Sequence, residues 1–123
     1  MANILLADDD QILIDLYQLK FTKAGHKIAF ANDSQEALAK VASQKPDIIF
    51  LDRRLGDQDG LALLGEIRKT ANGKTIPIIM LTNMDPTAED YSKVKQYAPT
   101  EYLIKGKVDL NDLVKKVKLL VKK

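Results

Sequence analysis

The 123-residue sequence contains no cysteine, and His26 is its single histidine. The lack of cysteine excludes disulfides, thiolate catalysis and cysteine-based metal sites. A single imidazole likewise excludes a metal site that this chain would build from several histidines. An excess of one charge is also absent, since 19 basic residues against 17 acidic ones leave a formal net charge of +2. Without an aromatic-basic motif, this balance gives no reason to expect direct binding to nucleic acid.

Long hydrophobic runs are missing as well. No apolar stretch is long enough to span a bilayer, and the N-terminus has no signal-peptide pattern. We therefore expect a cytoplasmic protein that makes no membrane contact. Hydrophobic residues make up 46% and charged residues 29% of the chain, which is an ordinary balance for a globular fold. The length fits a single domain over residues 1–123.

Short apolar segments alternate with amphipathic ones along the whole chain. The apolar segments predict strands at 3–7, 27–31, 47–51, 76–81 and 100–104. The amphipathic segments predict helices that begin after Asp10, at Asp33 or Ser34, at Asp59-Gly60, at Asp85-Pro86 and at Asp109. This alternation predicts an α/β fold with one doubly wound parallel sheet and helices on both faces.

The first predicted helix, over residues 11–24, carries more apolar side chains than one buried stripe needs. The predicted core stripe consists of Leu13, Leu16, Tyr17, Phe21 and Ala24. Off this stripe, and therefore expected to be exposed, are Ile12, Ile14 and Leu19. Exposed apolar side chains near a functional site can mark a docking surface.

Polar side chains follow the strands of the predicted sheet. Asp8 and Asp9 follow the first strand and Asp52 the third, while Thr82 and Lys105 follow the fourth and fifth. In a parallel sheet these positions converge at one edge, where ligands of such folds bind. Carboxylates that repel one another attract Mg²⁺, and a lysine and a hydroxyl beside them suit a phosphoryl group. A carboxylate can also serve as the nucleophile of phosphoryl transfer.

Each of these residues alone has a simpler explanation. An aspartate after a strand is often a turn or cap residue. Asp10, directly before the first predicted helix, is expected to be such a cap. The combination at successive strand ends is what favours a phosphoaspartate site.

The segments that carry this combination resemble the receiver domain of bacterial two-component response regulators, the CheY-like superfamily. The resembling segments are NILLADDD (3–10), PDIIFLD (46–52), Asp59-Gly60, IPIIMLT (76–82) and EYLIK (101–105). They have the order and spacing of the family, and the resemblance covers the whole chain. It implies the strand order 2-1-3-4-5 for the five-stranded sheet.

The resemblance also implies a role for each acid. Asp52 would be the phosphoacceptor and would bind Mg²⁺ together with Asp9. Asp8 would act on the ion mostly through water. The backbone carbonyl of Arg54 would be a further ligand.

The same resemblance implies how the phosphoryl group is held and read. Thr82 and Lys105 would contact phosphoryl oxygens. Tyr102 matches the aromatic switch residue, which turns inward when Thr82 is drawn to the phosphate. The phosphoryl donor would be a sensor histidine kinase or a histidine phosphotransfer domain, and its docking on the first helix would involve Ile12, Ile14 and Leu19. The output surface would be formed by the fourth helix, fifth strand and fifth helix, and phosphorylation could also drive dimerisation.

The sequence departs from the family at three positions. Gly106 replaces the usual proline after Lys105, and since a cis peptide bond is costly outside proline, we expect a trans bond there. Gly56 replaces another common proline. Asn83 stands where small residues are usual and could narrow access to the phosphoryl group.

Two arginines, Arg53 and Arg54, directly follow the expected phosphoacceptor. One hypothesis is that Arg54 and Met84 tune the lifetime of the phosphorylated form. The alternative is that both arginines are solvated loop residues that pair with Asp57 or Asp59.

The leading functional hypothesis is a phosphorylation-dependent signalling switch with no activity on a separate substrate. A degenerate receiver that acts as a phosphorylation-independent interaction module is the alternative. An aspartyl phosphatase is disfavoured because Arg54 stands where such enzymes have a second acid. A flavin or nucleotide site is disfavoured because no glycine-rich phosphate loop follows the first strand. The five lysines of the last helical segment, at 115, 116, 118, 122 and 123, are expected to form a solvated face. A stand-alone receiver and a domain cut from a longer protein both fit the sequence.

Overall fold

The central element of the computed structural model is a five-stranded parallel sheet with the strand order β2-β1-β3-β6-β7. The structure describes residues 2–55, 58–82, 88–97 and 99–121. The strands of the sheet are β1 (Asn3–Ala7), β2 (Lys27–Ala31), β3 (Ile48–Asp52), β6 (Ile78–Thr82) and β7 (Glu101–Ile104). This order confirms the predicted topology, in which the five main strands run 2-1-3-4-5 in chain order.

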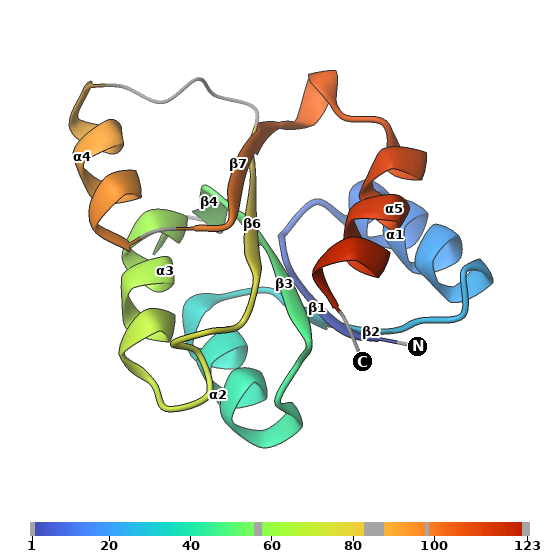
Figure 1. Ribbon diagram of the computed structural model, residues 1–123, viewed down its shortest axis with the longest axis horizontal. Coiled ribbons are helices and arrows are strands. Elements are labelled where there is room, and N and C mark those ends of the chain that lie inside the picture. The colour runs from blue at the N-terminus through green and yellow to red at the C-terminus, as the bar shows by residue number, and fades with distance from the viewer. Residues whose placement is uncertain (1, 56–57, 83–87, 98, 122–123) are drawn as a thin grey trace.

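Helices cover both faces of the sheet, as Figure 1 shows, with α1 and α5 on one side and α2, α3 and α4 on the other. They are α1 (Gln11–Lys23), α2 (Ser34–Gln44), α3 (Gly60–Lys69), α4 (Ala88–Tyr97) and α5 (Leu110–Leu120). Four of them begin at an aspartate whose side chain accepts a hydrogen bond from a backbone N–H of the first turn. These caps are Asp10, Asp33, Asp59 and Asp109.

Two hydrophobic cores result from the alternation of side chains along each strand. In β3, Ile49 and Leu51 belong to the core under α2 and α3, while Ile48 and Phe50 belong to the core under α1 and α5. All five residues of β3 are buried, which is why this strand is a continuous apolar run in the sequence. The centre of the sheet is therefore shielded from water on both faces, whereas the edge strands β2 and β7 are only partly buried.

The register brings the carboxyl ends of the strands level with one another. Ala7 of β1 is opposite Leu51 of β3, and Asp52 is opposite Leu81 of β6. Thr82 in turn is opposite Ile104 of β7. The residues that end or follow β1, β3, β6 and β7 thus gather at one edge, as predicted.

Two short elements were not predicted. An antiparallel pair, β4 (Arg54–Leu55) and β5 (Gln58–Asp59), lies between β3 and α3. A 3-10 turn, η1 (Lys105–Lys107), follows β7. Segments of two or three residues are too short to show a hydrophobic period. The expected trans bond before Gly106 is confirmed, because the described residues contain no cis peptide bond.

The predicted core stripe of α1 is partly wrong. Ile14, expected to be exposed, is buried, with 5% of its surface accessible. Leu16, expected in the core, is 47% exposed. The buried arc runs through Ile14, Tyr17 and Phe21 because the two rings pack edge-on and tilted against Phe50, with centroid distances of 6.1 and 5.4 Å. Aromatic packing against β3 therefore sets the rotation of the helix.

Among the described residues, no helix has both the length and the apolar character that crossing a membrane requires.

Truncation of Ile14 and of its neighbour Ile12 tests the rotation of α1. Ile14→Ala should lower the free energy of unfolding by about 2–5 kcal/mol, because it removes buried atoms and leaves a cavity. Ile12 is 81% exposed, so Ile12→Ala should change that free energy by less than about 0.5 kcal/mol. Urea unfolding followed by circular dichroism measures both. Equal losses would contradict the buried arc.

Candidate functional site

Three carboxylates meet at the edge where the strands end. Asp8 follows β1 and Asp52 is the last residue of β3, with 1% and 8% of their surfaces accessible. Asp9 is exposed beside them. One oxygen from each carboxylate lies within 4.8 Å of an oxygen from the other two. The structure thus brings together the three acids that the sequence predicted as a cluster.

Lys105 joins the two buried acids. Its Nζ lies 2.8 Å from Asp8 Oδ2 and 3.0 Å from Asp52 Oδ2. The lysine side chain is 11% exposed, so this bridge is largely shielded from water. Since Lys105 directly follows β7, the bridge ties that strand to the ends of β1 and β3. The predicted position of the lysine beside the acids is therefore confirmed.

Backbone N–H groups fix the remaining carboxylate oxygens. Asp8 Oδ1 accepts a hydrogen bond of 2.9 Å from the N–H of Asp10, and Asp52 Oδ1 accepts one of 3.3 Å from the N–H of Arg54. Asp10 Oδ1 itself accepts from the N–H groups of Ile12 and Leu13. Asp10 is thus a helix cap, as predicted, and its backbone also orients the neighbouring acid.

Burial and mutual repulsion set the ionisation of the site. Burial, followed by the negative charge of Asp8, raises the pKa of Asp52 above 3.8, although Lys105 offsets part of this effect. Burial alone would lower the pKa of Lys105, but its hydrogen bonds and charge interactions with Asp8 and Asp52 raise it overall. A permanent ammonium group therefore faces carboxylates that are crowded with negative charge. A hard cation would relieve that crowding.

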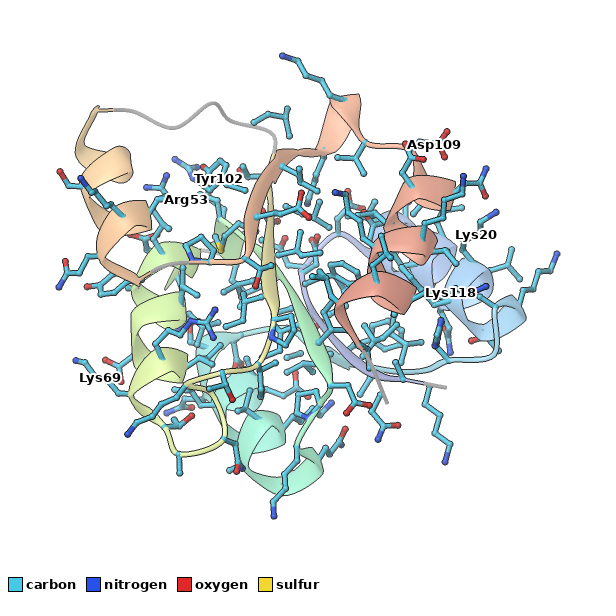
Figure 2. The ribbon with its side chains drawn as sticks, in the orientation of Figure 1. Lys20, Arg53, Lys69, Tyr102, Asp109 and Lys118 are labelled. Carbon is cyan, nitrogen blue, oxygen red and sulfur yellow. The ribbon has the colours of Figure 1, made fainter. Side chains whose placement is uncertain are left out.

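Thr82 and Tyr102 lie on the two strands nearest to the lysine. Thr82 ends β6 and is 2% exposed. Tyr102 of β7 is opposite Met80, and its half-buried ring packs against the core under α2 and α3. Its hydroxyl oxygen is itself shielded from solvent. In Figure 2, Tyr102 points into the region between β7 and α4.

The two arginines after Asp52 have different surroundings. Arg53 is 15% exposed, and its Nε donates to Asp59 Oδ1 at 3.1 Å. The prediction that an arginine pairs with Asp59 is confirmed, whereas the prediction that Arg53 is solvated is wrong. The reason is that Asp59 caps α3, so the ion pair joins the start of that helix to the end of β3. Arg54 is exposed on β4.

Gly60 is a site residue whose importance sequence reasoning missed. A Cβ atom at this position would lie 1.9 Å from the backbone oxygen of Asp52. The N–H of Gly60 also donates to the backbone oxygen of Arg53 at 2.6 Å. Only glycine allows this approach, and the Asp-Gly pair in the sequence indicates a turn and a cap without revealing the contact.

Four residues named in the sequence analysis lie outside the described part of the structure, and one predicted docking residue is buried. Gly56, Asp57, Asn83 and Met84 lie outside the described residues. Of the predicted docking residues, Ile12 and Leu19 are 81% and 57% exposed, but Ile14 is buried and is removed from this surface. Leu16, which is 47% exposed and four residues after Ile12, lies on the same helix face as Ile12.

Comparison with known proteins matches this chain to members of a single family. The model of the response regulator receiver domain matches residues 4–118. The alkaline phosphatase synthesis transcriptional regulatory protein PhoP of Bacillus subtilis (strain 168) is 35% identical over 91 residues, which are 74% of this chain and 36% of PhoP. The response regulator ArlR of Staphylococcus epidermidis (strain ATCC 35984) is 29% identical over 125 residues, with all of this chain and 54% of ArlR covered. This chain thus spans about half or less of these relatives.

Solved structures agree. The chemotaxis response regulator CheY4 of Vibrio cholerae superimposes with a TM-score of 0.84 at 27% identity, and 98% of each chain is covered. The Francisella response regulator 1452 receiver domain gives a TM-score of 0.84 at 28% identity, with 98% of this chain and 97% of the other covered. The fold and the family match together define the class: this chain belongs to the response regulator receiver domain family.

Neutralising Asp52 should stabilise the fold in the absence of divalent cations. Because the folded state raises the pKa of Asp52, it favours the protonated form, and its stability falls as pH rises through that pKa. Asp52→Asn should therefore have the higher free energy of unfolding at neutral pH. The difference should shrink as pH approaches 3.8, the ordinary pKa of this group.

Urea unfolding at several pH values, in metal-free buffer, measures this difference. Asp15→Asn is the matched control, since Asp15 is exposed on α1 and away from the site. A loss of stability in Asp52→Asn at neutral pH would mean that the ion pair with Lys105 outweighs the burial of charge.

Proposed function

We propose that this receiver domain takes a phosphoryl group onto Asp52 in a Mg²⁺-dependent reaction and changes conformation in response. The observation that carries the proposal is the buried Asp52 carboxylate, held between the Lys105 ammonium and two further acids. In this proposal the residues of the site position the phosphoryl group and stabilise its transfer, and the chain acts on no separate substrate. The donor would be a sensor histidine kinase or a histidine phosphotransfer protein.

The acid cluster suits a magnesium ion. Three carboxylates with oxygens within 4.8 Å offer the hard oxygen ligands that Mg²⁺ prefers, and one of them is exposed enough to leave room for water. We assign direct contacts to Asp9 and Asp52, a water-mediated one to Asp8, and a further contact to the backbone carbonyl of Arg54. When bound, the ion would neutralise negative charge on the phosphoryl oxygens.

The residues of the chain account for the chemical step. A carboxylate oxygen of Asp52 forms a bond to phosphorus while the bond between phosphorus and the donor nitrogen breaks, and the electron pair returns to the donor imidazole. The N–H of Arg54 holds one carboxylate oxygen, so the nucleophile has a fixed orientation. Lys105 already lies 3.0 Å from Asp52 and can pair with a phosphoryl oxygen without a large movement.

Thr82 and Tyr102 would convert the charge at Asp52 into a change of shape. The hydroxyl of Thr82 would bond a phosphoryl oxygen, and Tyr102 would follow on the neighbouring strand. This is a population shift between two conformations. The face formed by α4, β7 and α5 would be the output surface, and a phosphorylation-dependent dimer would use the same face. The cytoplasmic location stays a prediction.

Arg54 remains the candidate for tuning the lifetime of the phosphorylated form, because it is exposed and two residues past Asp52. The proposed contributions of Asn83 and Met84 lie outside the described residues. The degenerate-receiver alternative finds no support in the site, since the acids and the lysine are all present and in contact.

Phosphorylation by a small acyl phosphate tests the proposal directly. Incubation with the donor and Mg²⁺ should add one phosphate to the intact mass of the wild-type chain. Asp52→Ala should gain none, because it lacks the nucleophile, and the wild type should gain none without Mg²⁺. Asp15→Asn, which leaves the site intact, should behave as the wild type.

Failure to form an adduct, even with rapid sampling and with a stable phosphoryl analogue, would favour the degenerate receiver. An adduct on Asp52→Ala would assign the phosphate to another residue. In the same assay, the rate of phosphate loss from Arg54→Asn tests the tuning role of this arginine, and an unchanged rate would remove it.

Docking of the phosphoryl donor on α1 is a separate prediction. Ile12, Leu16 and Leu19 are exposed apolar residues of α1, the helix that follows Asp8 and Asp9 in the chain, and a charge there should weaken a helix-packing interface. Leu19→Asp should slow transfer from a phosphorylated histidine kinase by about tenfold, equivalent to about 1.4 kcal/mol, with no effect on transfer from an acyl phosphate. Leu119→Asp is the matched control, because Leu119 is 68% exposed on α5. Equal slowing of both donors would contradict docking at this surface.

A further inference from the structure

A second charged site lies between α1 and α5, away from the acid cluster. A groove of about 540 Å³ separates the end of α1 from the middle of α5. It is lined by Lys20, Lys23, Ala24, Asn111, Val114, Lys115 and Lys118. We call it the lysine groove. Figure 2 shows Lys20 of α1 and Lys118 of α5 on the same side of the molecule.

Lys20 of this groove is half-buried, and Lys23, Lys115 and Lys118 are exposed. They differ from the cations of the protein that have a carboxylate partner. Lys105, Lys116, Lys40 and Arg53 each have an ion pair with a carboxylate. In the described part of the chain, none of the four groove lysines is in such a pair, and no acid lines the groove. The groove is therefore a local concentration of positive charge on a chain whose net charge is only +2.

Helix dipoles explain only part of this arrangement. Lys20 and Lys23 lie in the last turn of α1, and Lys118 lies in the last turn of α5, where a cation is favourable. Lys115 lies in the middle of α5 and gains no such benefit. Four lysines that line one groove also concentrate like charge there, and a multiply charged anion bound among them would reduce their mutual repulsion.

We infer that the lysine groove is a binding site for a compact polyphosphate, either inorganic or part of a nucleoside polyphosphate. The volume of the groove is typical of small-ligand sites, which span about 300–1,000 Å³. Lysines act as point charges on phosphate and do not need fixed bidentate geometry. Ala24 and Val114 add an apolar floor, and Asn111 adds an amide that can donate or accept.

A long polymer is the less suitable ligand. Lys116, next in sequence to Lys115, faces away from the groove and is paired with Glu101 at 2.8 Å. The cations that line the groove thus come from two helices and do not form a stripe along one. No aromatic side chain lines the groove to stack a nucleic-acid base.

Binding of sodium tripolyphosphate to the full chain, in metal-free buffer, tests the inference. Calorimetry should show one site, and the amide resonances of the residues lining the lysine groove should shift in ¹⁵N NMR spectra. Lys23→Glu/Lys115→Glu should weaken binding at least tenfold. Lys69→Glu/Lys74→Glu should weaken it less than twofold, because these exposed lysines give the same change in net charge but line a different groove.

The pKa of His26 provides an independent measurement of ligand binding at the lysine groove. Burial lowers the pKa of His26 below 6.5, and the positive charge of the chain's amino terminus and then that of Lys118 lower it further. Tripolyphosphate beside Lys118 should screen that charge and raise the pKa of His26, as measured by NMR titration of its imidazole. Lys23→Gln/Lys115→Gln is the milder variant if the glutamate variant does not fold, and it too should bind more weakly than the control.

A comparison of two ligands shows whether the groove recognises inorganic polyphosphate or a nucleoside polyphosphate. Tighter binding of a nucleoside triphosphate than of tripolyphosphate would mean that the apolar floor contacts the nucleoside, and equal binding would mean that phosphate alone is recognised. Three results would overturn the inference: no binding, equal loss in the groove and control variants, or tighter binding of a single-stranded oligonucleotide than of tripolyphosphate.

Discussion

The contact between Lys105 and the carboxylates of Asp8 and Asp52 is the interaction on which the site depends. One ammonium group lies 2.8 and 3.0 Å from two buried acids that end different strands. Without it, two carboxylates would face each other with little solvent to separate their charges, and the pKa of Asp52 would rise further. The lysine therefore allows three strands to end at the same point with charged groups. It also keeps the nucleophile proposed here in a single position.

This contact is available because the rest of the sheet contains no polar side chain that competes with it. The strands β3 and β6 are buried along their whole length, and their side chains belong alternately to the two cores. In these two strands the polar side chains are those of the last residues, Asp52 and Thr82, and parallel pairing puts the strand ends together. The close approach of Gly60 to the backbone of Asp52 then fixes where α3 begins relative to β3. Hydrophobic packing thus positions the charged site without taking part in it.

The sequence was sufficient to predict the main strands and the acids at their ends, because buried strands are continuous apolar runs and because helix caps are local signals. The order of the strands was implied by the family resemblance alone. The sequence was not sufficient to predict which face of α1 is buried. Ile14 and Leu16 are equally apolar, and only the rings of Tyr17, Phe21 and Phe50 decide which of them is buried. The sequence suggested an ion pair with Asp59 but not that Arg53 forms it while shielded from solvent, and it gave no sign of the Gly60 contact. Both depend on how α3 packs against the end of β3.

The same contact limits how a phosphoryl group could change the structure. Lys105 is bound on both sides before any reaction, so a phosphate on Asp52 would find its counter-charge already in place and would gain little from moving it. The free energy for a conformational change must then come from contacts other than those of the lysine. Thr82 ends the strand between β3 and β7 and is buried at the same edge, so it is the side chain nearest in topology to both Asp52 and the strand of Tyr102. In the proposed mechanism, Lys105 would therefore hold the site in both states, and Thr82 would distinguish them.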